Sequence, residues 1–462
     1  MKFDNGIKIG LIPLYLELYD DLDPDLRYSF LPVINKIRQV LAEQGEVIES
    51  PIISKPSEID NLIDHFNSES VEVIVTFHLS YSPSLLIADA LKKLQKPLII
   101  ISTSVSRSFQ DMSDAYLLQN HGIHGVMDLA SVLQSMGLSF KIVSGYYQDS
   151  EFINDLTKSV QIIKAVKEFK NQRIGQTGVP FPMMGDFSIS YEYLNSAFGI
   201  QVISIPEKMI LQKQSIIEEK KYEDIMSNDR MSFDIIASGQ DTHKNSVLQY
   251  LALHQILDEQ NISAYTMEYL DCKEAAVPFY AVSRLMTEGF GYAGEGDVLT
   301  ASLGRPLNVL AGKAMFSEMF CPDWSDNLII MSHMGESDSR FANPEIRGQL
   351  VEKNAFGNKL KSLYHRFRFQ PGTVTFAAFA KTRPTGLKLV IGLLDIIDLP
   401  LFDCFKAPHY IVKPRMPLPE FLEKYSLSGG GHHLYIADGD IVNLIEAWSR
   451  ALGIETAEIS PN

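Results

Sequence analysis

Short apolar runs alternate with longer amphipathic stretches over the first 170 residues of the chain. Between the runs, apolar side chains recur three and four positions apart, which is the period of a helix with one buried face. The apolar runs predict strands at residues 7–16, 46–53, 71–78, 96–103 and 140–147. The stretches between them predict helices at residues 32–45, 57–69, 85–95 and 125–137. Because apolar strands separated by amphipathic helices are typical of a parallel sheet covered on both faces, we predict a doubly wound α/β domain over residues 1–172.

Two further patterns follow along the chain. Over residues 173–314, strand-like runs at 201–206 and 263–270 alternate with helical stretches at 214–227 and 245–260, which predicts a second, central α/β domain. From residue 315 onward, strand-like runs follow one another with few helical stretches between them, at residues 327–334, 372–382, 387–397 and 432–439. We therefore predict a β-rich C-terminal domain over residues 315–462, built as a small barrel or sandwich.

The stretch GFGYAGEGD, residues 289–297, carries the Gly-x-Gly-x-x-Gly spacing that some dinucleotide-binding folds use. That spacing holds a pyrophosphate only where the glycines follow a buried strand and open a helix. The residues before it have apolar side chains at helical spacing, so we predict a helix that ends near Gly289. This context disfavours a nicotinamide- or flavin-dependent enzyme and leaves Glu295, a carboxylate between glycines, to be explained.

Composition and charge exclude several classes of protein. The chain has 462 residues, of which 45% are hydrophobic and 21% charged, as in an ordinary globular protein. Its 41 basic and 57 acidic residues give a net charge of −16, which argues against nucleic acid as the main partner. Three distant cysteines and no Cys-x-x-Cys predict neither disulfides nor a zinc ribbon. No signal-peptide core opens the chain, and the longest apolar tract, residues 387–405, is interrupted by charges and a proline, so we expect a cytoplasmic protein without a membrane span.

Two glutamates and a set of histidines lie beside glycines or within apolar runs: Glu295, Glu318, His333, and the pair His432 and His433 after three glycines. Each also fits a structural role. Glu295 suits a helix N-terminus, Glu318 a solvated turn, and His333 a hydrogen-bonded position in the core. Taken together, they suggest more, since a buried carboxylate is costly unless it is paired or bound to a metal. Two glutamates and two histidines can form an octahedral site for Mn²⁺ or a similar ion that leaves positions for substrate oxygens.

At these residues the sequence resembles the L-arabinose isomerase family, within the wider group that includes L-fucose isomerase. AVSRLMTEGFGYAGEGDVLTASL is similar to the family's segment around its first metal-binding glutamate, and FSEMF to its Phe-Met-Glu-Asp. SHMGE is similar to its Ser-His-Met-Leu-Glu, and GGGHHLY to its Gly-Gly-Ala-His-His-Thr. Upstream, QNHGIHG and VSGYYQD resemble Asn-Gln-x-x-His-Gly and Val-Thr-Gly-His-Trp-Gln-Asp. The matches occur in the family's order between residues 116 and 434, which makes the resemblance specific.

The resemblance implies a metal site, a fold and an assembly. Glu295, Glu318, His333 and His433 would ligate a divalent cation, usually Mn²⁺ and otherwise an ion such as Mg²⁺ or Co²⁺. The fold would comprise an N-terminal and a central α/β domain followed by a C-terminal β-barrel. The chain would assemble as a homo-oligomer, a trimer or hexamer, with active sites between subunits. The glycines of GFGYAGEGD would then form a tight turn that presents Glu295 to the metal.

The resemblance also implies a reaction, the conversion of an aldose into a ketose through an enediolate. In such a reaction a metal polarises the carbonyl, a base removes the proton from C2 and an acid returns one to C1. Glu295 and Glu318 are the candidates for acid and base, and the sequence leaves open which is which. The alternative is a non-catalytic relative that binds a sugar.

The sequence departs from the family where the sugar is expected. The family's Ser-Gln-His-Leu-Tyr-Gly corresponds to LIPLYL here, a segment that has Pro13 and lacks the substrate-facing glutamine. In QNHGIHG, His121 replaces a family glutamine, whereas His124 keeps the histidine. We therefore expect His121 and His124 to contact the sugar, and we leave its identity open among pentoses, deoxyhexoses and other aldoses.

Overall fold

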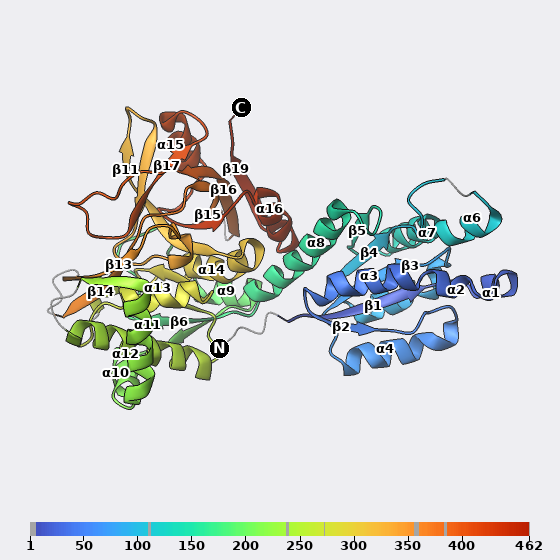
Figure 1. Cartoon of the computed structure of the whole chain (residues 1–462), viewed down its shortest axis with the longest axis horizontal. Coiled ribbons are helices and arrows are strands. Elements are labelled where there is room, and N and C mark those ends of the chain that lie inside the picture. Colours follow the sequence, from blue (N-terminus) through green and yellow to red (C-terminus); the bar gives the residue numbers. More distant parts are fainter. Residues whose placement is uncertain are drawn as a thin grey trace. The chain divides into compact units, whose positions relative to one another are not determined.

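The computed structural model describes residues 6–109, 112–236, 240–271, 273–354, 360–382 and 386–461. The chain divides into two compact units, Lys2–Lys164 and Ala165–Asn462 (Figure 1). Each unit has its own sheets and its own core, and each is described separately below. None of the helices in the described ranges is long and apolar enough to cross a bilayer.

The first unit contains a parallel five-stranded sheet with the order β2-β1-β3-β4-β5. Its strands are β1 (Lys8–Leu14), β2 (Glu46–Glu49), β3 (Val73–His78), β4 (Leu98–Ser102) and β5 (Lys141–Ser144). One apolar core packs α3 (Leu31–Ala42) and α8 (Ser150–Phe169), which continues into the second unit, on one face of the sheet. The other core packs α4 (Ile59–Ser68), α5 (Ala88–Leu94) and α7 (Gly122–Ser135) on the opposite face. The predicted doubly wound architecture is confirmed, because both faces of the sheet are apolar and covered.

Shorter helices lie near the carboxyl ends of these strands. They are α1 (Leu18–Leu22), α2 (Leu26–Ser29) and α6 (Asp114–Asn120), with the 3₁₀ turns η1 (Pro56–Glu58) and η2 (Ser84–Leu86). This edge of a doubly wound sheet is where ligands of such folds bind.

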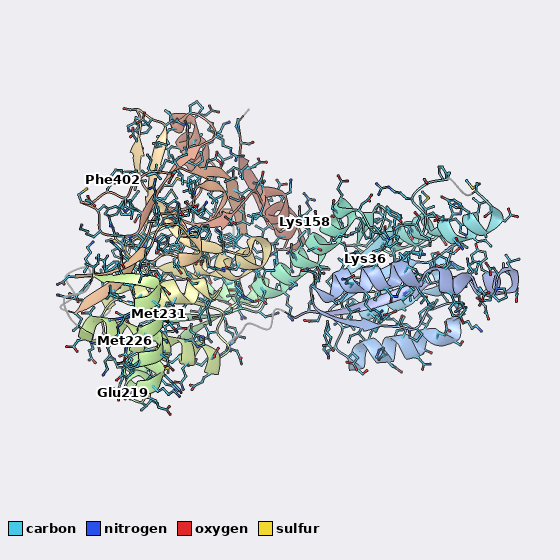
Figure 2. The ribbon with its side chains drawn as sticks, in the orientation of Figure 1. Lys36, Lys158, Glu219, Met226, Met231 and Phe402 are labelled. Carbon is cyan, nitrogen blue, oxygen red and sulfur yellow. The ribbon has the colours of Figure 1, made fainter. Side chains whose placement is uncertain are left out.

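The second unit opens with a parallel four-stranded sheet, ordered β10-β9-β6-β7. Its strands are β6 (Arg173–Thr177), β7 (Gln201–Ser204), β9 (Ala264–Met267) and β10 (Gly291–Gly294). The helices of this region are α9 (Tyr191–Phe198), α10 (Glu207–Gln214), α11 (Glu219–Ser232), α12 (Gln240–Glu259), α13 (Phe279–Thr287) and α14 (Val298–Ala311), with η3 (Tyr269–Asp271). On α11 one face is buried and the other exposed, as Met226 and Met231 illustrate (Figure 2).

A small sheet joins distant parts of this unit. Its order is β14-β13-β8, from β8 (Phe233–Ile236), β13 (Gly348–Asn354) and β14 (Lys361–Arg366). The sequence pattern did not predict these strands. The predicted division of the chain after residues 172 and 314 stays a prediction.

A closed six-stranded antiparallel barrel follows, which confirms the predicted β-rich C-terminal region. Its strands in order are β15 (Gly372–Thr382), β18 (His433–Asp438), β11 (Ala314–Asp323), β12 (Leu328–Ser332), β17 (His409–Pro414) and β16 (Gly386–Ile396). The barrel closes because β16 pairs with β15, and β19 (Glu455–Ile459) adds to β16 in parallel. The remaining elements are η4 (Ser339–Phe341), α15 (Leu418–Leu427) and α16 (Val442–Ala451).

The glycine stretch corrects one interpretation. Helix α13 does end before Gly289, as predicted. However, Gly291–Gly294 is not part of the expected tight turn but forms the strand β10, which pairs in parallel with β9 and leads through Glu295 and Gly296 into α14. The error has a physical cause, because a strand of only four residues, two of them glycines, is too short to show a period that a sequence pattern can detect. Asp297 caps α14, its carboxylate accepting a hydrogen bond from Thr300 N at 2.8 Å, and a negative charge at that helix start opposes phosphate binding.

Candidate metal centre

Two strand ends, the middle of a third strand and one turn bring the four predicted side chains together. Glu318 lies in β11, opposite Ser332 of β12 on one side and His433 of β18 on the other. His333 directly follows Ser332, so barrel register alone makes these three residues neighbours. The register of β11 shifts just after Glu318, between Met319 and Cys321, as at a bulge that turns a side chain toward a site.

The fourth residue, Glu295, reaches the cluster from the turn between β10 and α14. Its backbone has a φ of 60° and the next residue, Gly296, a φ of 74°. Such positive φ values let the chain reverse in two residues, and they are uncommon for a glutamate. The close packing also needs Gly294, since a Cβ there would lie 2.6 Å from Cε1 of His333.

The ligand-type atoms of the four residues converge. Nε2 of His433 lies 3.5 Å from Oε2 of Glu295 and 3.7 Å from Oε1 of Glu318. Nε2 of His333 lies 3.9 Å from Oε2 of Glu318, and the two imidazole rings are 5.4 Å apart. One ligand atom from each of Glu318, His333 and His433 falls within a group no more than 4.8 Å across.

Two buried carboxylates fix the orientation of the two imidazoles. Nδ1 of His433 is 2.9 Å from Asp297, and Nδ1 of His333 is 3.0 Å from Glu336. Glu336 in turn accepts hydrogen bonds from Tyr269, Tyr292 and its neighbour's backbone. Because each carboxylate engages Nδ1, Nε2 of each ring is directed toward the glutamates. A carboxylate behind an imidazole is the usual support of a metal-binding histidine.

Three atoms of this cluster are buried without a hydrogen-bond partner among the described residues: Oε2 of Glu295, Nε2 of His333 and Nε2 of His433. A buried polar atom without a partner costs free energy. Because these three atoms face one another, a single bound ion can satisfy all of them. A divalent cation binds carboxylate oxygen and imidazole nitrogen at about 2.0–2.2 Å. The donor set and its unsatisfied atoms therefore fit such a cation.

The charges of the cluster are strongly coupled. Burial lowers the pKa of His433, but the hydrogen bond to Asp297 and the nearby carboxylate of Glu295 outweigh it and raise that pKa to about 9. Burial raises the pKa of Glu295, but His432 and His433 outweigh it and hold that pKa well below its ordinary value. In the metal-free protein, protonated imidazole thus supplies the positive charge that the carboxylates require.

A second, overlapping group includes the neighbouring histidine. Ligand atoms of Glu295, His432 and His433 also lie within 4.8 Å of one another. Nε2 of His432 is 3.9 Å from Glu295 and 3.7 Å from Glu318, and its Nδ1 is 2.5 Å from Asp186. Unlike the other two imidazoles, His432 is exposed.

Models of one protein family match almost the whole chain. The N-terminal domain of L-arabinose isomerase matches residues 31–171, its central domain residues 194–313 and its C-terminal domain residues 313–455. The chain belongs to the L-arabinose isomerase family. The expected family is thereby confirmed.

Similar members of this family include enzymes from several bacteria. The L-arabinose isomerase of Geobacillus thermodenitrificans is 24% identical over 444 residues, covering 93% of this chain and 89% of the relative. That of Shouchella clausii is 25% identical, with coverage of 98% and 94%, and that of Thermotoga neapolitana is 24% identical, with coverage of 90% and 86%.

The other two site residues predicted from the family resemblance, His121 and His124, lie in the first unit. They stack on one another with ring centroids 5.5 Å apart, and Nε2 of His121 is 2.8 Å from the hydroxyl of Tyr19. Burial, together with the charge of His124, lowers the pKa of His121. The structure thus brings these two residues to each other, and their contact with a sugar stays a prediction.

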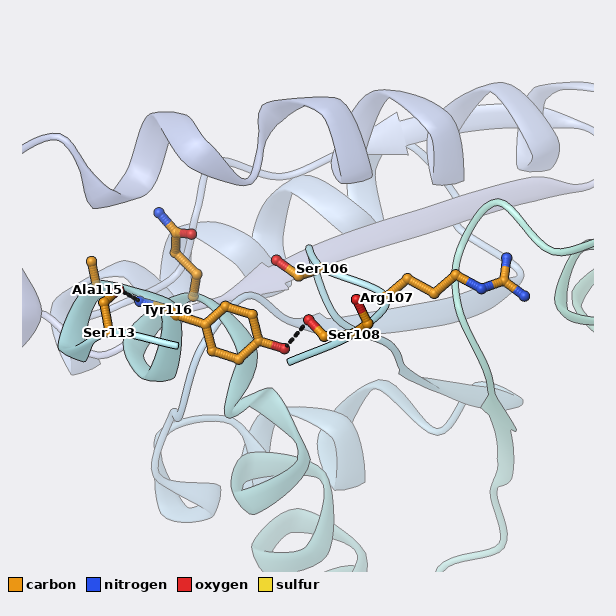
Figure 3. A pocket seen from close by; sticks show the side chains of 7 residues that line it. Ser106, Arg107, Ser108, Ser113, Ala115 and Tyr116 are labelled. Atoms are coloured by element: carbon orange, nitrogen blue, oxygen red, sulfur yellow. Dashed lines mark hydrogen bonds between the residues drawn. The ribbon is translucent and has the colours of Figure 1, made fainter. Parts of the chain in front are cut away.

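The first unit also holds a polar pocket of about 350 Å³ (Figure 3). It is lined by Ser106, Arg107, Ser108, Ser113, Ala115, Tyr116 and Gln119. The hydroxyl of Tyr116 donates to the carbonyl of Ser108 at 2.9 Å, which closes one side. The pocket contains none of the predicted site residues.

The residues that support the two imidazoles were not among those predicted from the sequence. Both lie inside the quoted motifs: Asp297 is two positions after Glu295, and Glu336 is three positions after His333. This closeness in sequence could have indicated that the two carboxylates lie beside the site. Asp186 carried no such signal, because it is 246 positions from the histidine that it contacts.

Proposed function

We propose that this chain is a metal-dependent aldose–ketose isomerase whose site is formed by Glu295, Glu318, His333 and His433. Membership of the family supports the reaction class. The observation that carries the metal is the set of three buried atoms that face one another and have no hydrogen-bond partner in the described part of the chain. We infer Mn²⁺ as the preferred ion, with Mg²⁺ or Co²⁺ as substitutes, since oxygen and imidazole ligands suit all three.

The two glutamates perform the proton transfers of the proposed reaction. One carboxylate takes the proton from C2 of the aldose, and the electron pair of that bond forms the C1–C2 double bond of an enediolate. A proton then returns to C1 while another moves from O2 to O1, so no oxidant or reductant is consumed. A bound divalent cation would polarise the carbonyl and stabilise the negative charge on the sugar oxygens. Glu295 and Glu318 are equally placed for the base, since both face the imidazole nitrogens.

The test uses the whole protein stripped of metal with a chelator. Aldopentoses and deoxyhexoses are offered with Mn²⁺, Co²⁺ or Mg²⁺, and ketose formation is measured by chromatography. We expect turnover with at least one sugar, loss of turnover on chelation and recovery on addition of the ion. Saturable sugar binding without turnover under any ion would contradict the proposal and support the non-catalytic alternative.

We further propose that His121 and His124 select the sugar. A neutral imidazole offers one donor and one acceptor, whereas the amide of glutamine offers two donors and a carbonyl. His121→Gln should therefore reorder the aldoses by kcat/KM, with changes of about 1–3 kcal/mol between sugars. The Mn²⁺ affinity should stay the same. His65→Gln, an exposed histidine of the same unit, is the matched control. An equal loss for every sugar would show that His121 does not discriminate among them.

The proposal includes a homo-oligomer, a trimer or hexamer, located in the cytoplasm. Unpaired Cys321 and Cys404 suit a reducing compartment. Helices α1, α2, α6 and α7 of the first unit expose large apolar side chains: Leu18, Leu22, Tyr28, Leu117, Ile123 and Met127. Neighbouring exposed apolar side chains mark association surfaces, and we assign this one to a second copy of the chain.

Light scattering of the purified protein tests the assembly. Changing Leu22 and Met127 together to glutamate should lower the mass in solution. Met231→Glu, an equally exposed methionine of α11, should not. A wild-type protein that is monomeric at micromolar concentration would contradict the proposed homo-oligomeric assembly.

A further inference from the structure

The segment between β6 and α9 lies against the proposed metal ligands, as three sets of contacts show. The ring of Phe187 stacks on His433 with centroids 5.1 Å apart and planes 6° from parallel. Phe181 N donates to the carbonyl of Glu295 at 2.9 Å. From the barrel, Nζ of Lys381 donates to the carbonyls of Gly185 at 2.5 Å and Ser188 at 3.0 Å. The segment is thus attached to the site at several points.

Two residues of this segment contact His432: the ring centroids of Phe187 and His432 are 5.8 Å apart, and Asp186 makes the polar contact. A single carboxylate oxygen, Oδ2, accepts from the backbone N of His432 at 2.9 Å and from its Nδ1 at 2.5 Å. The ring is therefore held with its proton on Nδ1 and with Nε2 toward the glutamates. Nε2 lies 3.7 Å from Oε1 of Glu318 and 3.9 Å from Oε2 of Glu295.

His432 also differs from the four proposed ligands in its surroundings. Its side chain is 39% exposed, against 1% for each of the other two imidazoles. An imidazole that borders the cluster and remains accessible can form a hydrogen bond with a small polar molecule that enters beside the cation.

We propose that Asp186 is a positioning residue of the isomerase site, which orients His432 so that Nε2 binds a hydroxyl of the sugar. The inference rests on the proposed function. It assigns His432 to the substrate and not to the cation, although the geometry of the second ligand group would also allow ligation. The carboxylate acts as in other carboxylate–imidazole pairs, where it sets the tautomer and direction of the ring.

The decisive variant is Asp186→Asn. Its amide oxygen can still accept from the backbone N and Nδ1 of His432, but the negative charge that holds the ring is lost, so kcat should fall about 10- to 100-fold. Asp186→Glu keeps the charge and should recover part of the loss. Mn²⁺ affinity, measured by calorimetry without sugar, should change less than about threefold in both variants. A parallel loss of Mn²⁺ affinity would make His432 a ligand and overturn the assignment.

Lys381→Met supplies the matched control, because it removes a different attachment of the segment, the bonds to Gly185 and Ser188, and leaves Asp186 in place. We expect its kcat to stay within about threefold of wild type. If Lys381→Met reproduces the loss of Asp186→Asn, Asp186 merely holds the segment and the proposal is wrong. An unaltered kcat in Asp186→Asn would also overturn it. Failure of the proposed function itself is distinguishable, since it would appear as wild-type protein without isomerase activity.

Discussion

At the scale of single residues, Glu295 combines two unfavourable features. Its φ of 60° is strained for a residue with a Cβ, and its Oε2 is buried without a partner among the described residues. Both features lower the stability of the fold, but they place the carboxylate of Glu295 where a metal can bind it. Lower stability at a functional residue is a common consequence of such placement.

Glycine and alanine at position 295 separate these two features. Both variants remove the carboxylate and should weaken Mn²⁺ binding by about 100-fold or more, since one of four proposed ligands is lost. Only glycine also relieves the strain, so metal-free Glu295→Gly should be about 1 kcal/mol more stable than metal-free Glu295→Ala. Denaturant unfolding measures the difference. Equal stabilities of the two variants would show that the left-handed turn carries no strain.

The protonated state of His433 makes metal binding depend on pH. A cation needs the neutral ring, so the proton must leave, and in the metal-free protein the pKa of His433 is raised to about 9. Mn²⁺ affinity should therefore rise, by at most about tenfold per pH unit, from pH 6.5 to about pH 9 and then level off. Calorimetry in buffers of different ionisation enthalpy should detect proton release at pH 7. Binding without proton release at that pH would contradict the coupling.

The stability of the metal-free protein should change with pH in the opposite direction to the Mn²⁺ affinity, falling as pH rises. The pKa of His433 is higher in the folded protein than in the unfolded chain, so the folded protein holds its proton more tightly. The contribution of His433 to the free energy of unfolding is then complete below about pH 6.5 and is lost as pH rises through about 9.

At the scale of elements, the approach of β10 to α14 places Glu295. A Cβ on Gly291 would lie 2.3 Å from the carbonyl oxygen of Ala301 in α14 and 2.9 Å from Cβ of Ala264 in β9. The hydroxyl of Tyr435 also bridges the backbone of Tyr292 to the barrel. The glycine spacing at the start of this stretch therefore serves helix–strand packing beneath the cluster.

Gly291→Ala tests that role. Because the added carbon meets backbone and not a flexible side chain, α14 must shift, and we expect a loss of about 1–3 kcal/mol in the free energy of unfolding. The shift also moves the turn that carries Glu295, so Mn²⁺ affinity should fall. Gly185→Ala is the control, since its Cβ would meet nothing within 4 Å. Similar unfolding free energies for the two variants would refute this packing role.

At the scale of the whole molecule, the four proposed ligands all belong to the unit Ala165–Asn462. A ligand stabilises only what it binds, by about 2.7 kcal/mol at a concentration 100 times its Kd. Differential scanning calorimetry of the metal-free protein should show Mn²⁺ raising the unfolding temperature of this unit by several degrees. The transition of Lys2–Lys164 should stay in place. An equal rise of both transitions would mean that the two units unfold as one.

Local pattern alone determined a large part of this protein. The parallel strands of the first unit, the helices between them and the β-rich C-terminal region follow from runs and periods of apolar residues, which act over a few neighbours. The order of short motifs pointed to the family and named Glu295, Glu318, His333 and His433, because each motif is contiguous in the chain.

Tertiary structure decided the rest. Strand β8 pairs with β13 across more than 100 residues, and β10 is a strand only because β9 lies beside it. The register that sets Glu318 against His433, and the contact of Asp186 with His432, exist only once the barrel has closed and the segment before α9 lies against it. Such contacts join residues far apart in the chain through backbone pairing and side-chain packing, so no local pattern of apolar and polar residues specifies them.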